Sequence, residues 1–175
     1  RMKAPSLELN ISKALRKTFI AGLTLVFFFG LTLFFSSTAK KIADYNNKIG
    51  QRVEAQRYYS YCTALTPFNA PCHSGLAVGY YEQGDLEASR KELLNVVALD
   101  PWSSLPYVRL GELAEKQGRY EEAEKYYRKA VELFKYTYPK NYRYLAEFYR
   151  RRGDEAGLMW IGEVFPDRYP LNKAY

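Results

Sequence analysis

Four glycines divide most of this chain into nearly equal intervals. Gly50, Gly84 and Gly118 are 34 residues apart, and Gly153 follows 35 residues later. The residues after the first three are also related: Gly-Gln-Arg-Val-Glu-Ala, Gly-Asp-Leu-Glu-Ala and Gly-Arg-Tyr-Glu-Glu-Ala. Self-similarity at a fixed period of this length is typical of proteins built from stacked supersecondary units. The spacing therefore predicts an array of repeated units over most of the 175 residues.

Within one period, the pattern of residues predicts two antiparallel helices. A glycine permits the tight turn between the helices, and a proline stops the second helix before the next unit begins. Pro67 and Pro101, also 34 residues apart, occupy that stopping position. Small residues such as Ala77 and Gly111 let two helices approach closely, while Tyr and Leu fill the space beside them. The expected fold class is all-α.

This arrangement resembles the tetratricopeptide repeat (TPR) family, whose period is 34 residues. The resemblance is best in one unit, where the matching residues are Tyr107, Leu110, Gly111, Ala114, Gly118, Ala123, Tyr127 and Ala130. It extends over units of about 36–69, 70–103, 104–138 and 139–165, although Ser89 replaces the usual Ala and Lys135 the usual Pro. The resemblance implies a TPR-type solenoid of three to four repeats over residues 40–165, followed by a tail, 166–175.

The residues near the N-terminus have the composition of a segment that lies in a lipid bilayer. After a short basic segment, residues 1–17, the chain has 22 consecutive uncharged residues, 18–39. As a helix they would span roughly 33 Å, enough to cross a hydrocarbon core of about 30 Å, and their threonine hydroxyls can bond to the helix's own carbonyls. The alternative is a cleaved secretory signal, with Ser37-Thr38-Ala39 as the cleavage site. That alternative is disfavoured because the apolar run exceeds the usual signal length.

The predicted membrane helix has no obvious end before the repeats begin. Neither Gly nor Pro occurs between Phe35 and Asn46. We therefore expect one continuous helix from about Lys13 to about Lys48, which would hold the repeats rigidly at the membrane surface. A hinge at Ser36-Ser37-Thr38 is the alternative.

The net charge of +7 is concentrated near the predicted membrane segment. Residues 1–39 carry five Lys or Arg and one Glu, whereas residues 40–175 carry 21 basic and 18 acidic residues. This distribution argues against nucleic acid as a partner. Five basic residues precede the helix and five follow within about twenty residues, so charge does not decide the orientation. Because a short basic tail is hard to translocate, we expect a single-pass plasma (inner) membrane protein with a cytoplasmic N-terminus and extracytoplasmic repeats.

The sequence contains no pattern typical of catalysis or metal binding. It has one histidine, His73, and two cysteines, Cys62 and Cys72, without zinc-ligand spacing, and no phosphate-binding or serine-nucleophile motif. The Cys72-His73 pair resembles a haem-attachment site that lacks its first cysteine, but the start of a helix is the ordinary interpretation. Since the two cysteines fall on neighbouring helices, a disulfide is compatible with the geometry; a packed free thiol is the alternative for Cys62. We expect no enzyme activity, cofactor or metal.

The resemblance also implies where a partner would bind. TPR arrays commonly hold an extended peptide or a helix through the outward positions of each first helix. In this chain those positions include Val78, Tyr81, Glu112, Glu115, Arg143, Glu147 and Arg150. Arg143 with Arg150-Arg151-Arg152 would form a basic end for an acidic partner or a lipid headgroup, or simply a solvated helix terminus. The Lys and Asn set that clamps a chaperone's terminal carboxylate is not reproduced.

Three functions are compatible with these features. The first is a non-enzymatic membrane scaffold whose repeats bind other protein subunits of a larger complex. The second is an anchored assembly or targeting factor, for secretion, pilus or cytochrome maturation, that binds clients transiently. The third is part of a glycan-handling transferase.

Overall fold

The computed structural model describes residues 6–133 and 141–164, and in these ranges it contains eight α-helices and no strand. The helices are α1 (Ser6–Lys48), α2 (Arg52–Leu65), α3 (Ala70–Gln83), α4 (Leu86–Leu99), α5 (Leu105–Lys116), α6 (Tyr120–Leu133), α7 (Asn141–Arg152) and α8 (Glu155–Val164). The predicted all-α class is confirmed. The chain divides into two compact units, residues 1–69 and 70–175, and each is considered separately.

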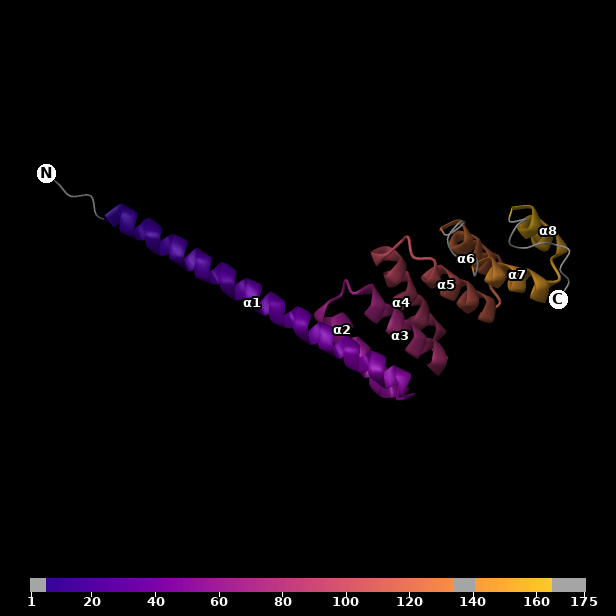
Figure 1. Ribbon diagram of the computed structural model, residues 1–175, viewed down its shortest axis with the longest axis horizontal. Coiled ribbons are helices and arrows are strands. Elements are labelled where there is room, and N and C mark those ends of the chain that lie inside the picture. The colour runs from indigo at the N-terminus through magenta and orange to yellow at the C-terminus, as the bar shows by residue number, and fades with distance from the viewer. Residues whose placement is uncertain (1–5, 134–140, 165–175) are drawn as a thin grey trace. The chain divides into compact units, whose positions relative to one another are not determined.

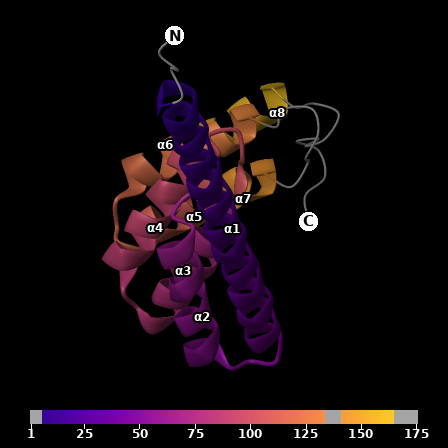
Figure 2. The ribbon, with the colours of Figure 1, turned by 90° about the vertical axis from the view of Figure 1, so that its left-hand side faces the viewer.

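The first unit is a long helix with a short one packed beside its C-terminal end. Figure 1 shows α1 as one unbroken ribbon, which confirms the continuous helix and excludes the hinge at residues 36–38. Figure 2 shows α2 alongside the end of α1, joined to it by a tight turn. The side chains of Ala43 and Ala55 are buried, so the two helices approach closely. This part of α1 is therefore the first helix of a helical hairpin.

The apolar part of α1 is covered by nothing within the described structure. Phe19 and Leu25, for example, are 68% and 71% exposed. The hydroxyls of Thr18, Thr24 and Thr32 donate to main-chain carbonyls one turn earlier, at 2.9, 2.8 and 2.7 Å, as the sequence predicted. Among the residues described, one helix, within Leu15–Lys48, is long and apolar enough to cross a membrane.

The second unit is built from three helical hairpins that stack in chain order. The pairs are α3 with α4, α5 with α6, and α7 with α8, and contacts of α4 with α5 and of α6 with α7 join them. One cluster of buried side chains includes Ala77, Leu93 and Leu110, and a larger one extends from Val108 to Ile161. Because each hairpin buries only part of its apolar surface alone, stacking gives the unit a continuous core.

The four regularly spaced glycines lie in tight turns between helices, as the sequence predicts. Gly50, Gly84, Gly118 and Gly153 have φ of 82°, 83°, 74° and 66°, the left-handed region that side chains disfavour. In each turn the residue after the glycine donates its N–H to the carbonyl five residues earlier, as in the 2.8 Å bond from Arg119 to Ala114. This is the Schellman arrangement that closes a helix. The same left-handed glycine turn therefore recurs about every 34 residues.

Gly118→Ala is expected to lower the free energy of unfolding by about 1 kcal/mol, because alanine must adopt a left-handed backbone. No atom beyond Gly118 and its two chain neighbours lies within 4 Å of the position that a Cβ would occupy, so the effect would come from the backbone alone. Gly118→Asn should cost less, since asparagine tolerates this conformation. Urea unfolding followed by circular dichroism measures both. Equal stability of the glycine and alanine proteins would contradict the turn's role.

Some positions named in the sequence predictions lie outside the residues that the structure describes. They are residues 1–5, residues 134–140 with Lys135, and the tail 166–175 with Phe165 before it.

Candidate functional site

A hollow of about 220 Å³ opens between α3, α4 and α5 in the second unit. Helix α3 contributes Ala77, Val78, Tyr81 and Glu82, α4 contributes Ser89 and Leu93, and α5 contributes Arg109 and Glu112. We call this set the α3–α5 hollow. Its floor is apolar and its rim carries charges, the usual composition of a site that takes up a side chain of a ligand.

The floor of the hollow depends on a small residue in α4. Ser89 is buried, and its hydroxyl donates to the main-chain carbonyl of Ala77 at 2.8 Å. The hydrogen bond satisfies a polar group that would otherwise be costly to bury. The departure from the TPR pattern at this position therefore leaves a well-formed contact between α3 and α4.

The rim is held by charge contacts within α5 and between α3 and α5. Arg109 donates to Glu112 at 2.7 Å, and the Lys116 ammonium lies 4.5 Å from the centre of the Tyr81 ring. Burial opposes the charge on Arg109, but the hydrogen bond and charge of Glu112 raise the pKa of Arg109 above its ordinary value. The rim consequently presents both charge signs beside an apolar floor.

The structure brings three of the predicted partner-binding residues together and uses another elsewhere. Val78, Tyr81 and Glu112 line the hollow. Glu115 accepts bonds from Tyr127 at 3.1 Å and from two nitrogens of Arg151, each at 2.8 Å. These contacts tie α5 to α6 and α7, so Glu115 acts as a connector between repeats.

The predicted residues of α7 do not line the hollow. Arg143 lies 4.0 Å from Glu147, one turn away on the same exposed face. Arg150 is exposed at the end of the helix, and the Arg152 guanidinium lies 3.9 Å from the centre of the Tyr120 ring. Arg151 is bound to Glu115, so Arg151 and Arg152 both contact the preceding hairpin of α5 and α6.

Two large tyrosines form core contacts, and one of them, Tyr127, is among the residues that match the TPR pattern. Tyr127 and Tyr149 are 1% and 0% exposed, and Tyr149 donates to Glu124 at 2.7 Å. Burial raises the pKa of each phenol, and the nearby carboxylates raise both further. Both therefore stay neutral donors near neutral pH.

The histidine and the cysteines take no part in the hollow. His73 Nδ1 lies 2.5 Å from Glu92 Oε2, which links α3 to α4. Cys62 and Cys72 are both disulfide-bonded, and neither is a free thiol. Within the part of the chain that the structure describes, no group of three or more His, Cys, Asp or Glu side chains could hold a metal.

Several residues that shape these surfaces are not predicted by the sequence pattern. Leu93 and Arg109 line the hollow although neither occupies an expected outward position. Gly157 in α8 is also unexpected: an added Cβ would lie 2.6 Å from the Tyr149 ring. A signal for it exists, because Gly157 is a second small residue shortly after Gly153, in the helix that follows the large Tyr149.

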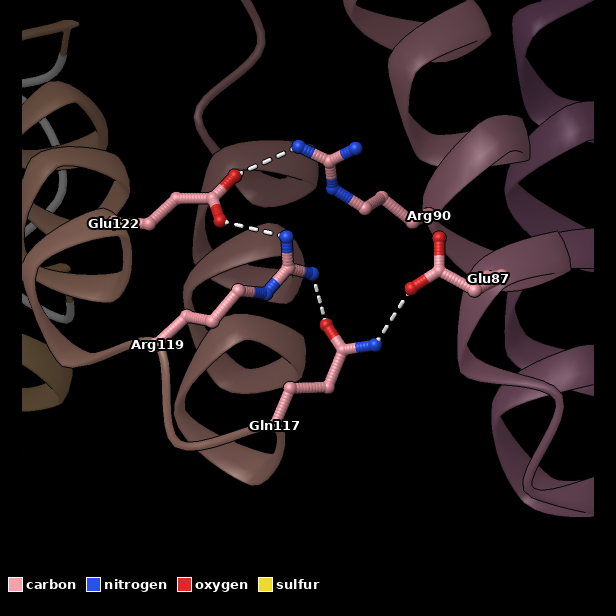
Figure 3. Close-up of polar contacts among 5 residues, drawn as sticks. All are labelled: Glu87, Arg90, Gln117, Arg119 and Glu122. Atoms are coloured by element: carbon pink, nitrogen blue, oxygen red, sulfur yellow. Dashed lines mark hydrogen bonds and ion pairs between the residues drawn. The ribbon is translucent and has the colours of Figure 1, made fainter.

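Neighbouring repeats are also joined by a polar cluster near the turn between α5 and α6, drawn in Figure 3. Glu122 accepts from Arg90 at 2.8 Å and lies 2.9 Å from Arg119. Gln117 donates to Glu87 at 2.9 Å and accepts from Arg119. The cluster links α4 to α5 and α6 through several groups that have more than one partner.

Glu122→Gln is expected to lower stability at neutral pH by up to about 1 kcal/mol, the range of partly exposed ion pairs. The hydrogen bond from Arg90 lowers the pKa of Glu122. Burial acts in the opposite direction, but the charge of Arg119 lowers the pKa further. A lowered folded pKa means that the contribution is complete above the unfolded pKa and is lost as pH falls through the folded one. The deficit of Glu122→Gln should therefore begin to shrink as pH falls below the ordinary glutamate pKa of about 4.3, and should continue to shrink at lower pH. Denaturant titrations at several pH values measure it, and a pH-independent deficit would contradict the charge argument.

In the hairpin of α5 and α6 the buried Tyr127 packs on Gly111. The same hairpin is the part of the chain that matches a known family. Residues 105–135 match the tetratricopeptide repeat model. This TPR match includes both helices and the Gly118 turn between them. Comparison with curated proteins finds no matching relative.

Solved structures with the TPR fold resemble the chain. The crystal structure of MamA superposes with a TM-score of 0.67 at 16% identity, over 76% of this chain and 77% of that chain. The first TPR of Spaghetti (RPAP3), bound to an HSP90 peptide, gives 0.61 at 20% identity, over 67% and 93%. Pseudomonas aeruginosa PilF gives 0.64 at 18% identity, over 81% and 64%. The resemblance establishes the fold, a TPR-type stack of helical hairpins.

Proposed function

We propose that this protein is a non-enzymatic scaffold, anchored by α1 in a membrane, whose TPR unit holds a segment of another protein subunit. The observation that carries the proposal is the α3–α5 hollow. It combines an apolar floor of Ala77 and Leu93, beside the partly exposed Val78, with a rim of both charge signs. Such a site suits an apolar side chain of an extended segment, whose neighbouring polar groups can meet the rim.

The membrane part of the proposal is supported by the exposed apolar surface of α1. A contiguous surface of this size is rarely left in water, and a spanning helix requires about 20 apolar residues. The disulfide-bonded state of Cys62 and Cys72 favours an oxidising compartment for the TPR unit. We therefore propose a cytoplasmic N-terminus and an extracytoplasmic TPR unit in a plasma (inner) membrane.

Photo-crosslinking in native membranes tests the scaffold. A photoreactive phenylalanine analogue at Val78 should capture a partner protein, whereas the same residue at Leu94 on α4 should not. The two positions are matched, since both side chains are 39% exposed, but only Val78 lines the hollow. Equal capture at both positions, or capture at neither, would overturn the proposed binding site.

A second proposal is an assembly factor that binds clients transiently, and the resemblance to PilF is the observation that favours it. A scaffold should co-purify with its partner in mild detergent at a fixed ratio. An assembly factor should yield crosslinked clients but little stable complex. Reversing Arg143 and Arg150 to Glu should then weaken client capture, because both side chains are exposed on α7.

A further inference from the structure

Two side-chain contacts between α1 and α2 show which part of α1 lies beside the end of α2. Tyr59 donates to Asp44 at 2.7 Å, and the Thr66 hydroxyl contacts the Ser36 hydroxyl. From the first pair to the second, the residue number rises on α2 and falls on α1, so the helices are antiparallel in a constant register. Figure 2 shows the two lying side by side.

That register places the end of α2 where the apolar part of α1 ends. Ser36 directly follows Phe34 and Phe35, which are 63% and 55% exposed. Thr66 is therefore level with the last turn of the apolar run. The chain turns directly after Thr66, through Pro67 and Phe68, where the N–H of Asn69 donates to the Thr66 carbonyl at 3.0 Å. Because this tight turn keeps Phe68 close to Thr66, Phe68 lies near the level of Ser36.

Polarity along α2 changes in the same direction as along α1. The charged residues of α2 are Arg52, Glu54 and Arg57, all in its first half, and residues 58–69 carry no Asp, Glu, Lys or Arg. Toward the other end, Tyr61, Leu65 and Phe68 are 47%, 39% and 61% exposed. On α1 the first charges beyond the apolar run are Lys40 and Lys41, slightly farther along than Ser36.

We propose that the end of α2 and its following turn, residues 61–68, rest in the headgroup region of the bilayer that α1 crosses. The inference rests on the proposed anchoring by α1. Aromatic side chains at this depth, with lysines just beyond it, form the belt typical of membrane interfaces. A protein partner would not require polarity to follow the distance from the apolar run on both helices, and a bilayer does. The contact would hold the first hairpin against the membrane at two places.

Tryptophan fluorescence in vesicles of brominated-acyl phosphatidylcholine tests this contact, with the full chain and unbrominated vesicles for reference. Phe68→Trp, Phe27→Trp and Val53→Trp are compared with the parent protein, whose Trp102 and Trp160 set the background. Val53 is the matched control, since it is 73% exposed on the same helix about 20 Å from Thr66. Circular dichroism confirms that each variant is folded, and Leu65→Trp repeats the test at a second position.

The expected result is strong quenching of the added emission at position 27, clear quenching at positions 68 and 65, and none at position 53. Quenching at 27 without quenching at 68 and 65 would overturn the interfacial contact while leaving the anchor intact. Absence of quenching at 27 would overturn the anchor, and the contact with it. Quenching at 53 equal to that at 68 would also overturn the contact, because the depth gradient would be absent.

Discussion

Tyr127→Ala is expected to lower the free energy of unfolding by about 3–5 kcal/mol, the usual cost of deleting a fully buried aromatic side chain. Tyr127 is 1% exposed, its ring packs 5.5 Å from that of Phe148, and its hydroxyl bonds to Glu115. The substitution would leave a cavity between α5, α6 and α7. Urea unfolding of the full chain in detergent, followed by circular dichroism, measures the loss.

Tyr127→Phe separates the ring from its hydroxyl. It keeps the packing and removes one hydrogen bond, while Glu115 retains both bonds from Arg151. The expected cost is about 1 kcal/mol. A phenylalanine variant as unstable as the alanine variant would contradict the ring's packing role and assign the stability to the polar contact.

Gly111 provides a second check on the same contact. A Cβ at this position would lie 2.8 Å from Cε1 of Tyr127, so Gly111→Ala should destabilise the parent protein. In the Tyr127→Ala background the obstruction is gone, and alanine should then stabilise α5 by up to about 1 kcal/mol through helix propensity. A double-mutant cycle in which the effect of Gly111→Ala does not depend on residue 127 would contradict the close approach.

Reduction of the cysteines is expected to produce the second large effect. Since the chain has two cysteines and both are disulfide-bonded, we propose that Cys62 and Cys72 are bonded to each other. A loop of about ten residues closed by a disulfide is stabilised by roughly 3 kcal/mol through the lost entropy of the unfolded chain. Thermal unfolding with and without a reductant measures the effect as a drop in Tm.

The double variant Cys62→Ser, Cys72→Ser is the control for reduction. It should unfold at the lower Tm of the reduced parent, and a reductant should not change its Tm further. A parent protein whose Tm is insensitive to the reductant would contradict the structural role of the bond.

Much of the fold could be predicted because it follows from local physical requirements. A left-handed turn at Gly118, a proline after the cap at Thr66 or Asp100, and an unbroken run from Phe35 to Asn46 each act within a few residues. Repetition at a fixed spacing strengthens such local signals, because a repeat with an atypical residue can still be assigned from the matching positions in the other repeats. The continuous α1 was predictable for the same reason.

The candidate site was less predictable because it depends on contacts between helices that are distant in sequence. Glu112 and Glu115 are separated by less than one turn of α5, yet Glu112 lines the hollow and Glu115 is held by Tyr127 and Arg151. Glu115 and Arg151 are 36 positions apart in the sequence, so no local pattern indicates their contact. Leu93 and Arg109 were not predicted for the corresponding reason.

By itself, the sequence determined the helical hairpins, their period and the apolar stretch, because turn conformation, helix length and hydropathy are set by neighbouring residues. The tertiary structure alone decided which outward side chains remain available in the α3–α5 hollow and which are used between repeats. It also placed the end of α2 level with the end of the apolar run. Those features depend on register and burial, and both arise only when separate helices pack against each other.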